Sequence, residues 1–203
     1  MTSPITGPLT RPDQVAVSAL LTEAFEADPA YAYFLSGCSP TKKDHYRALL
    51  IRFVVAYHCQ FGMPVWGTTL NGQLVACALV EAPGPEWRRA LALLWQLPRL
   101  IGRVPLSSVQ HMNQYARVSR RGLPNTIRHY LIKIGVSSNH QGQGLGKSLI
   151  SAIVNHYQQS EGMMGLDTEN PDNVPLYEHL GFQLHDQLTL DSLKIYRMYR
   201  PLK

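Results

Sequence analysis

The stretch that decides the fold is Gln141-Gly142-Gln143-Gly144-Leu145-Gly146, in which every second residue is a glycine. The residues before it, 129–136, form a short and mainly apolar run, which is typical of a buried strand. The residues after it, 147–160, carry apolar side chains three and four positions apart, which predicts a helix with one buried face. The sequence therefore predicts a strand, a glycine-rich turn and a helix in direct succession.

This succession favours the binding of an anion at the turn. The first backbone N–H groups of a helix have no intrahelical partners, and the helix dipole is positive at that end. Glycine lacks a Cβ atom, so the backbone at Gly142, Gly144 and Gly146 can approach a phosphate closely. Lys147 adds a positive charge at the rim of the turn. The alternative is a tight connection between strand and helix that binds no ligand.

The spacing of the glycines does not fit two common phosphate-binding patterns. A dinucleotide-binding turn has the pattern GxGxxG, whereas the glycines here alternate as GxGxG. The chain after Gly146 is also too short for a second mononucleotide-binding half, although one could precede the turn. The phosphate loop of NTPases needs a glycine five positions before Gly146, where Gln141 stands. The turn alone therefore identifies no cofactor.

The rest of the chain alternates between helical and strand-like segments. Asn71-Gly72 predicts a type I′ hairpin turn, because both central residues of such a turn need a positive φ. Asp28-Pro29 is expected to end the first helix, and Pro98 and Pro105 are expected to end or kink two short helices. In chain order we expect helices around 20–25 and at 44–60, strands at 63–69 and 73–80, and short amphipathic helices within 91–101. Beyond the central strand and helix we expect a strand at 163–168, a short helix at 173–180 and a hairpin of strands at 182–190 and 193–199. This order predicts an α/β fold with a mixed sheet.

Length and composition fit a single domain, 1–203, of ordinary globular character. The longest apolar runs are far shorter than the roughly 20 residues that a membrane-spanning helix needs, and residues 1–14 lack the apolar core of a signal peptide. Cys38, Cys59 and Cys77 form no CxxC pair, and the histidines show no metal-ligand spacing. We therefore expect a cytoplasmic protein with no membrane span, no disulfide framework and no metal.

The net charge of +5 comes from one internal segment, residues 87–128. Its eight arginines are Arg88, Arg89, Arg99, Arg103, Arg117, Arg120, Arg121 and Arg128, and it contains no Asp, Glu or Lys. Such a segment could meet a polyanion, an anionic membrane surface or an anionic small molecule, and otherwise it is a solvated helical face. Few aromatic residues interleave with the arginines and no nucleic-acid-binding motif is present, so we expect no nucleic acid partner.

Residues 141–146 resemble the signature Q/R-x-x-G-x-G/A of the GCN5-related N-acetyltransferase (GNAT) superfamily, found between the fourth strand and the third helix of those proteins. Gln141, Gly144 and Gly146 occupy the specified positions. A second stretch, residues 173–182, reads Asn-Val-Pro-Leu-Tyr-Glu-His-Leu-Gly-Phe and resembles a family segment in which an Asn precedes Tyr-Glu-x-x-Gly-Phe. Two separate motifs are much more specific than either alone. The resemblance covers mainly residues 131–199.

Within the superfamily the chain is most similar to the puromycin N-acetyltransferase type, judged from residues 135–142 and from the helical segment ahead of the fourth strand. The resemblance implies an α/β, GNAT-like fold with a mixed, mostly antiparallel central β-sheet flanked by helices. It places a helical insert at about 86–128, before the fourth strand, and a CoA-binding core at about 129–182 of a single acetyltransferase domain. It also implies that the fourth strand, which ends at Val136, splays from its neighbour.

The function that the resemblance implies is transfer of the acetyl group of acetyl-CoA to a primary amine by direct attack in a ternary complex. The pantetheine arm would pair with the fourth strand, where an N–H near Ile134 and Val136 would polarise the thioester carbonyl. Asn173 would reach the pantetheine or the adenylate side, and Tyr177 would protonate the departing thiolate. The pyrophosphate would be held by Gln141, Gly142, Gln143, Gly144, Leu145, Gly146 and Lys147.

No motif position fixes the base that deprotonates the amine. Glu169, at the end of the predicted strand 163–168, is the first candidate, and His129, at the start of the strand 129–136, is the second. Each catalytic candidate has a structural alternative: Glu169 as a turn residue, His129 bonded to backbone, and Tyr177 as a core residue.

The identity of the amine does not follow from the sequence. A small molecule is favoured, while peptide N-termini and lysines stay open, and a homodimer is compatible with the sequence. The alternative function is a non-catalytic acyl-CoA-binding sensor or partner-binding module. Both functions need the glycine-rich turn, but only the enzyme needs Tyr177.

Overall fold

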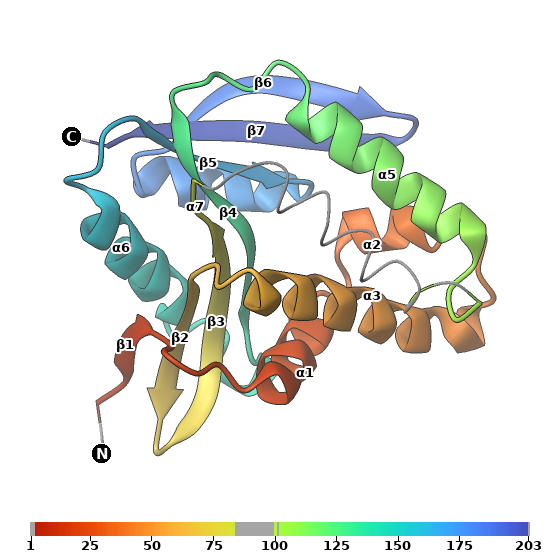
Figure 1. The fold of residues 1–203 in the computed structure, drawn as a ribbon, viewed down its shortest axis with the longest axis horizontal. Helices are drawn as coiled ribbons and strands as arrows, with labels where there is room; N and C mark the ends of the chain where they lie inside the picture. Colours follow the sequence, from red (N-terminus) through yellow and green to blue (C-terminus); the bar gives the residue numbers. More distant parts are fainter. Residues whose placement is uncertain (1–2, 84–99, 101, 203) are drawn as a thin grey trace.

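A computed structural model describes residues 3–83, 100 and 102–202, and Figure 1 shows the arrangement of their helices and strands. The described strands form one seven-stranded sheet in the order β1-β2-β3-β4-β5-β7-β6. Neighbours run antiparallel except for β4 and β5, which are parallel. The strands are β1 (Ile5–Pro8), β2 (Val65–Leu70), β3 (Gln73–Glu81), β4 (Ile127–Val136), β5 (Met163–Thr168), β6 (Gln183–Leu190) and β7 (Leu193–Pro201). The expected mixed, mostly antiparallel sheet is therefore confirmed.

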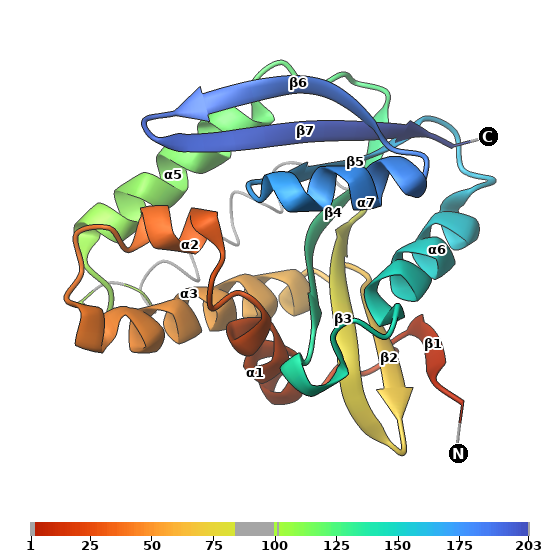
Figure 2. The ribbon, with the colours of Figure 1, turned by 180° about the vertical axis from the view of Figure 1, so that it is seen from behind.

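Helices cover both faces of the sheet. They are α1 (Gln14–Ala24), α2 (Pro29–Phe34), α3 (Pro40–Gln60), α5 (Leu106–Arg120), α6 (Leu145–Tyr157) and α7 (Val174–His179), with short 3-10 turns at Ser138–His140 and Pro171–Asn173. Alternate residues of a strand point to opposite faces. On β3, Ala76 and Ala78 pack in the core with α6 and α7, which Figure 2 shows in front of the sheet. Cys77 and Leu79 pack on the other side with α1, α2 and α3.

The first hairpin follows the expected turn chemistry. Asn71 and Gly72, between β2 and β3, have φ angles of 51° and 78°. Both central residues thus have the positive φ that a type I′ turn requires. The predicted turn is confirmed.

The parallel strands β4 and β5 separate part-way along their length. Their pairing ends at Leu131 and Leu166. Beyond that pair β5 continues beside β7 to Thr168, while β4 continues beside β3 to Val136. Ile132 has no counterpart on β3 and forms a bulge at the point of separation. One edge of β4 therefore has no strand partner beyond Leu131, as expected for a splayed fourth strand.

Two N-terminal elements differ from the sequence-based expectation. β1 has only four residues and gains its partner from β2, some sixty residues later, so no local pattern marks it. Asp28-Pro29 was expected to end the first helix, but α1 already ends at Ala24, and Asp28-Pro29 begins α2 instead. Asp28 accepts a hydrogen bond from the backbone N–H of Tyr31 at 3.0 Å, and Pro29 occupies the first turn. An Asp cap followed by Pro is a helix start signal as well as a stop.

The segment before β4 is described only in part. The short helices expected within 91–101 lie almost entirely outside the described residues. α5 is one helix of 15 residues that begins after Pro105; it lies within the helical insert expected at about 86–128, although no helix was predicted at these residues. α3 begins at Pro40 rather than at residue 44. Among the helices of the described residues, none combines the length and the apolar character that a bilayer crossing requires.

Candidate active site

A cavity of about 680 Å³ lies where β4 and β5 separate. Its described lining comes from the segment after α1, from α2, α3 and α5, from both separated strands and from α7. Glu169, Asn173 and Tyr177 all belong to this lining. With Ile134, the structure therefore brings four of the predicted site residues to one cavity.

Glu169 directly follows β5. The Tyr115 hydroxyl on α5 donates a hydrogen bond to Glu169 Oε1 over 2.5 Å. Burial, followed by the nearby charge of Asp28, raises the pKa of Glu169 to about 7, although the Tyr115 hydrogen bond and the Lys133 charge act in the opposite direction. A carboxyl group with a pKa near neutrality can both accept and release a proton at physiological pH.

Tyr177 reaches the cavity from α7. It is buried, and its ring meets that of Phe182 edge-on with 6.0 Å between the centroids. Burial, and then the charges of Glu169 and Asp28, raise the pKa of the Tyr177 hydroxyl well above its ordinary value. The hydroxyl therefore carries its proton at neutral pH. Asn173, just before α7, donates from Nδ2 to Thr168 Oγ1 over 3.4 Å.

Sequence reasoning did not single out Lys133 and Asp28, which also line the cavity. Lys133 Nζ lies 4.5 Å from the centre of the Phe25 ring and 4.8 Å from that of Tyr31. Burial acts to lower the pKa of Lys133, but Tyr31 and Asp28 outweigh it, so the pKa is raised overall. Lys133 is therefore a charged ammonium that lies over two rings and close enough to Asp28 to be affected by its charge. A single lysine within an apolar strand is the sequence signal that could have found it.

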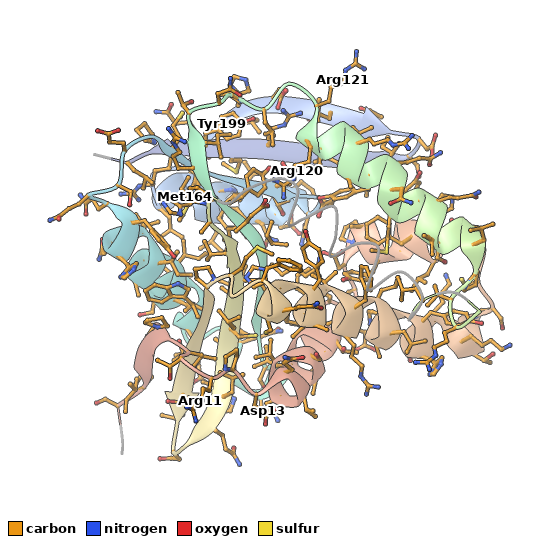
Figure 3. All side chains as sticks on the ribbon, viewed as in Figure 1. Arg11, Asp13, Arg120, Arg121, Met164 and Tyr199 are labelled. Atoms are coloured by element: carbon orange, nitrogen blue, oxygen red, sulfur yellow. The ribbon has the colours of Figure 1, made fainter. Side chains whose placement is uncertain are left out.

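One of the arginines pairs with a carboxylate of the cavity. Arg120 Nη2 lies 2.5 Å from Glu81 Oε2, and its guanidinium carbon lies 4.6 Å from the centre of the Tyr130 ring. Figure 3 shows the Arg120 side chain directed towards the interior, whereas that of Arg121 projects away from α5. Arg88, Arg89 and Arg99 lie outside the described residues. Arg120 thus pairs with a carboxylate of the cavity although the residue itself is exposed.

The glycine-rich turn precedes α6 and is exposed. Gly142 and Gly144 have φ angles of +74° and +75°, which side chains other than glycine rarely adopt. Gly144 is the N-cap of α6 and has no side chain to pair with the first N–H groups of the helix. The Leu145 side chain packs into the core. Gln141 Nε2 donates to the carbonyl of Val136 over 3.3 Å, which ties the turn to the end of β4.

The remaining residues predicted to hold CoA lie around the same turn and strand. Gln143 Nε2 donates to the carbonyl of Asn139 over 3.4 Å, and Lys147 is exposed on the first turn of α6. A Cβ atom on Gly146 would lie 3.4 Å from Val136 Cγ2, so the start of α6 lies in van der Waals contact with the end of β4. Ile134 lines the cavity. The unpaired edge of β4 therefore connects the turn to the cavity.

His129 does not share the site with Glu169. It is not among the described residues that line the cavity, and its ring stacks on that of Tyr157 on α6 with 4.0 Å between the centroids. Burial, and then the charge of His156, lower the pKa of His129. Its neighbour Tyr130 lines the cavity from the opposite face of β4. We therefore assign His129 to the packing of α6 and not to proton transfer.

Within residues 3–83, 100 and 102–202, no three His, Cys, Asp or Glu side chains are grouped closely enough to hold a metal ion. Cys38, Cys59 and Cys77 are all free thiols. Burial raises the pKa of Cys77 to about 12, so this thiol is not a nucleophile at neutral pH.

Comparison with known proteins identifies the family. The sequence pattern of the acetyltransferase (GNAT) family matches residues 35–182, from the end of α2 to the residue before β6. The chain belongs to the GNAT family. An uncharacterized N-acetyltransferase of Schizosaccharomyces pombe is 27% identical over 200 residues, which span 90% of this chain and 76% of that protein. Mycothiol acetyltransferase of Kocuria rhizophila is 42% identical over 53 residues, or 25% of this chain and 18% of that enzyme.

Solved structures agree with a GNAT fold. The structure of histone acetyltransferase HPA2 and related acetyltransferase from Corynebacterium glutamicum has a TM-score of 0.74 at 20% identity, over 100% of this chain and 98% of that one. The ribosomal-protein-S18-alanine N-acetyltransferase of Escherichia coli has a TM-score of 0.59 at 16% identity, over 98% and 94% of the two chains. At such identities the likeness concerns the fold alone.

The GNAT family uses acetyl-CoA, and one similar structure is the NatC complex bound to Gag peptide and CoA. That structure has a TM-score of 0.52 at 17% identity and covers 100% of both chains. None of the relatives named here is a puromycin N-acetyltransferase, so that narrower resemblance stays a prediction.

Proposed function

We propose that this GNAT protein transfers the acetyl group of acetyl-CoA to a primary amine of a small molecule by direct attack in a ternary complex. The observation that carries the proposal is the placement of Glu169 and Tyr177. The two side chains come from different elements and line one cavity, at the point where β4 leaves β5. A group able to accept a proton thus stands close to a group able to donate one.

The chain's own groups fit acetyl-CoA as the donor. The unpaired edge of β4 offers backbone groups to an extended pantetheine arm, with an N–H near Ile134 and Val136 available for the thioester carbonyl. The uncapped N–H groups at the start of α6 and the side chain of Lys147 suit a pyrophosphate. Asn173 is placed to reach the arm beside Tyr177. When bound, acetyl-CoA supplies an acetyl group activated as a thioester.

Glu169 and Tyr177 have linked roles in this proposal. Glu169, with its pKa of about 7, accepts the proton that the amine loses. Tyr177 donates its hydroxyl proton to the sulfur of the leaving thiolate. The charge of Glu169 is one cause of the raised pKa of Tyr177. Because Glu169 becomes neutral when it takes the amine proton, it eases the loss of the Tyr177 proton at the step that needs it.

A small-molecule acceptor is favoured by the shape of the site. The cavity volume of about 680 Å³ falls within the range of roughly 300–1,000 Å³ typical of small-ligand pockets. Its described walls come from elements on both sides of the split sheet. A lysine on a folded protein surface reaches such a site less readily than a free amine does. The free thiols of Cys38, Cys59 and Cys77 suit the cytoplasmic location that we propose with this function.

The test is the Tyr177→Phe variant, assayed by thiol release from acetyl-CoA with a panel of amines. We expect turnover to fall by about 10²-fold or more, because general acid catalysis typically contributes that much. Acetyl-CoA affinity, measured by calorimetry, should stay within about twofold because the ring is kept. Tyr196→Phe, which removes a hydroxyl outside the cavity lining, is the matched control.

Two results would count against the proposal. Unchanged turnover in Tyr177→Phe removes Tyr177 from the mechanism. Tight acetyl-CoA binding with no transfer to any amine of the panel favours the alternative of a non-catalytic acyl-CoA-binding module.

A further inference from the structure

Four aromatic rings form a continuous wall on one side of the cavity. The ring centroids lie 5.7 Å apart for Phe25 and Tyr31, 5.5 Å for Tyr31 and Phe34, and 5.4 Å for Phe34 and Tyr115. Successive rings meet edge to face, at angles of 71°, 72° and 78°. All four residues line the cavity, and we call them the aromatic wall. A ligand ring placed against such a wall gains edge and face contacts in addition to apolar burial.

The charges of the cavity favour a cation over an anion. Its described lining contains the acidic residues Asp28, Glu81, Asp167 and Glu169 and the basic residues Arg120 and Lys133. Both basic groups are already engaged: Arg120 pairs with Glu81, and Lys133 lies over two rings of the wall under the charge of Asp28. Glu169 is bonded to the neutral hydroxyl of Tyr115 and shares the charge of Lys133 with Asp28. A ligand carboxylate would thus meet excess negative charge, whereas a ligand ammonium would meet Glu169.

The chain itself shows that an ammonium is stabilised in this environment. Lys133 Nζ lies within 5 Å of two ring centres of the aromatic wall and keeps its charge although the residue is half-buried. Cations are attracted to ring faces at such distances, and more strongly where water is excluded. An amine that enters the cavity meets the same two kinds of partner, an aromatic ring and the carboxyl group of Glu169, and the nearby charge of Lys133 favours the neutral amine that attack requires.

We propose, on the basis of the N-acetyl transfer inferred above, that the acceptor is a small aromatic monoamine without a carboxylate. Its ring packs on the aromatic wall, and its amino group approaches Glu169. Phe25 and Phe34 act as specificity-determining residues for the ring, and Tyr115 contributes both a wall ring and the hydroxyl that holds Glu169.

The experiment compares matched acceptors in the thiol-release assay with saturating acetyl-CoA. Phenethylamine is the reference, L-phenylalanine adds only a carboxylate, hexylamine replaces the ring by a chain, and spermidine adds further charges. We expect kcat/KM for phenethylamine to exceed that for L-phenylalanine by about tenfold or more, because like charges placed together are costly. The kcat/KM for phenethylamine should exceed that for hexylamine by about three- to tenfold, which is the ratio that corresponds to the free energy of a favourable contact between aromatic rings. Spermidine should be acetylated less efficiently than phenethylamine.

A wall variant tests the placement of the ring. Phe34→Leu should lower the ratio of kcat/KM for phenethylamine to that for hexylamine by about threefold or more. Because both acceptors are assayed on the same sample, the ratio does not depend on how much of the variant is folded. Phe61→Leu is the control, since Phe61 packs on Tyr57 at 5.1 Å but is not part of the described cavity lining. Its ratio should equal that of the unmodified protein.

The outcomes separate this proposal from the proposed function. If L-phenylalanine, spermidine or a peptide amine is the better acceptor, the assignment of an aromatic monoamine as acceptor is refuted, while the proposed transferase activity is supported. If phenethylamine binds in calorimetry and Phe34→Leu weakens that binding, but no amine is acetylated, the binding of an aromatic amine at the wall is supported and the proposed transferase activity is refuted. If phenethylamine neither binds nor reacts, the present proposal is overturned. An unchanged ratio in Phe34→Leu also overturns the assignment of the ring to the wall.

Discussion

The hydrogen bond from Tyr115 to Glu169 should set the pH at which the enzyme works. The Tyr115 hydroxyl donates over 2.5 Å to Glu169 Oε1 and thereby favours the charged carboxylate, which lowers the pKa of Glu169. Tyr115→Phe keeps the ring in the wall and removes only this donor. Hydrogen bonds to charged groups contribute about 1.5–3 kcal/mol. Because about 1.4 kcal/mol corresponds to one pKa unit, the pKa of Glu169 should rise from about 7 by roughly one to two units.

The sign of the effect follows from the role of Glu169 as a base. The base must be ionised to accept a proton, so a higher pKa moves the acid limb of the kcat profile to higher pH by the same amount. The assay is kcat against pH with saturating acetyl-CoA and one fixed amine, so that any titration of the amine is common to both proteins. Tyr33→Phe is the matched control, because its hydroxyl bonds to Asp191 at 2.8 Å and not to Glu169. An acid limb that stays in place in Tyr115→Phe, or that moves to lower pH, would refute the reasoning.

Two further predictions concern stability and cosubstrate binding. Glu169→Gln should stabilise the fold by about 3 kcal/mol near pH 8 and hardly at all near pH 4. Burial raises the pKa of Glu169 from 4.5 in the unfolded chain to about 7 in the folded protein, so the free energy of unfolding falls as the pH rises between these two values. The glutamine variant has no charge to bury and avoids this loss. Chemical unfolding at the two pH values measures this, and equal effects at both would show an ordinary pKa. Lys147→Ala should weaken acetyl-CoA binding by about two- to fivefold, and less at high salt, as expected for an exposed charge. Calorimetry on Lys194→Ala, an exposed lysine on β7, provides the comparison, and equal losses in both variants would remove Lys147 from the site.

The sequence predicted those turns and helix starts whose conformation depends on a few neighbouring residues. Asn71 and Gly72 form the expected turn because their positive φ angles are a property of two residues. The glycine-rich turn likewise lies between a strand and a helix, as the pattern of residues 129–160 indicates. β1 escaped prediction because its stability comes from pairing with β2 and not from its own four residues.

The site was harder to predict because its parts come from distant segments. Asp28, Tyr115, Lys133 and Glu169 meet only after four elements have packed, so no spacing in the sequence joins them. Simple alternation along a strand would also place Lys133 on the same face as His129. The bulge at Ile132 shifts the alternation by one residue and brings Lys133 to the face of Tyr130. One unpaired residue thus decides which side chains enter the cavity.

The aromatic wall and the proposed chemistry lie on different parts of the chain, and this division has a consequence for how new activities could arise. Phe25 and Phe34 come from the N-terminal segments, whereas Glu169 and Tyr177 belong to the C-terminal half that carries the family motifs. Changes at Phe25 or Phe34 could therefore alter the choice of amine and leave proton transfer intact. Tyr115 belongs to both sets, since its ring continues the wall and its hydroxyl holds Glu169. An adaptation at Tyr115 to a new amine would also change the range of pH in which the enzyme is active.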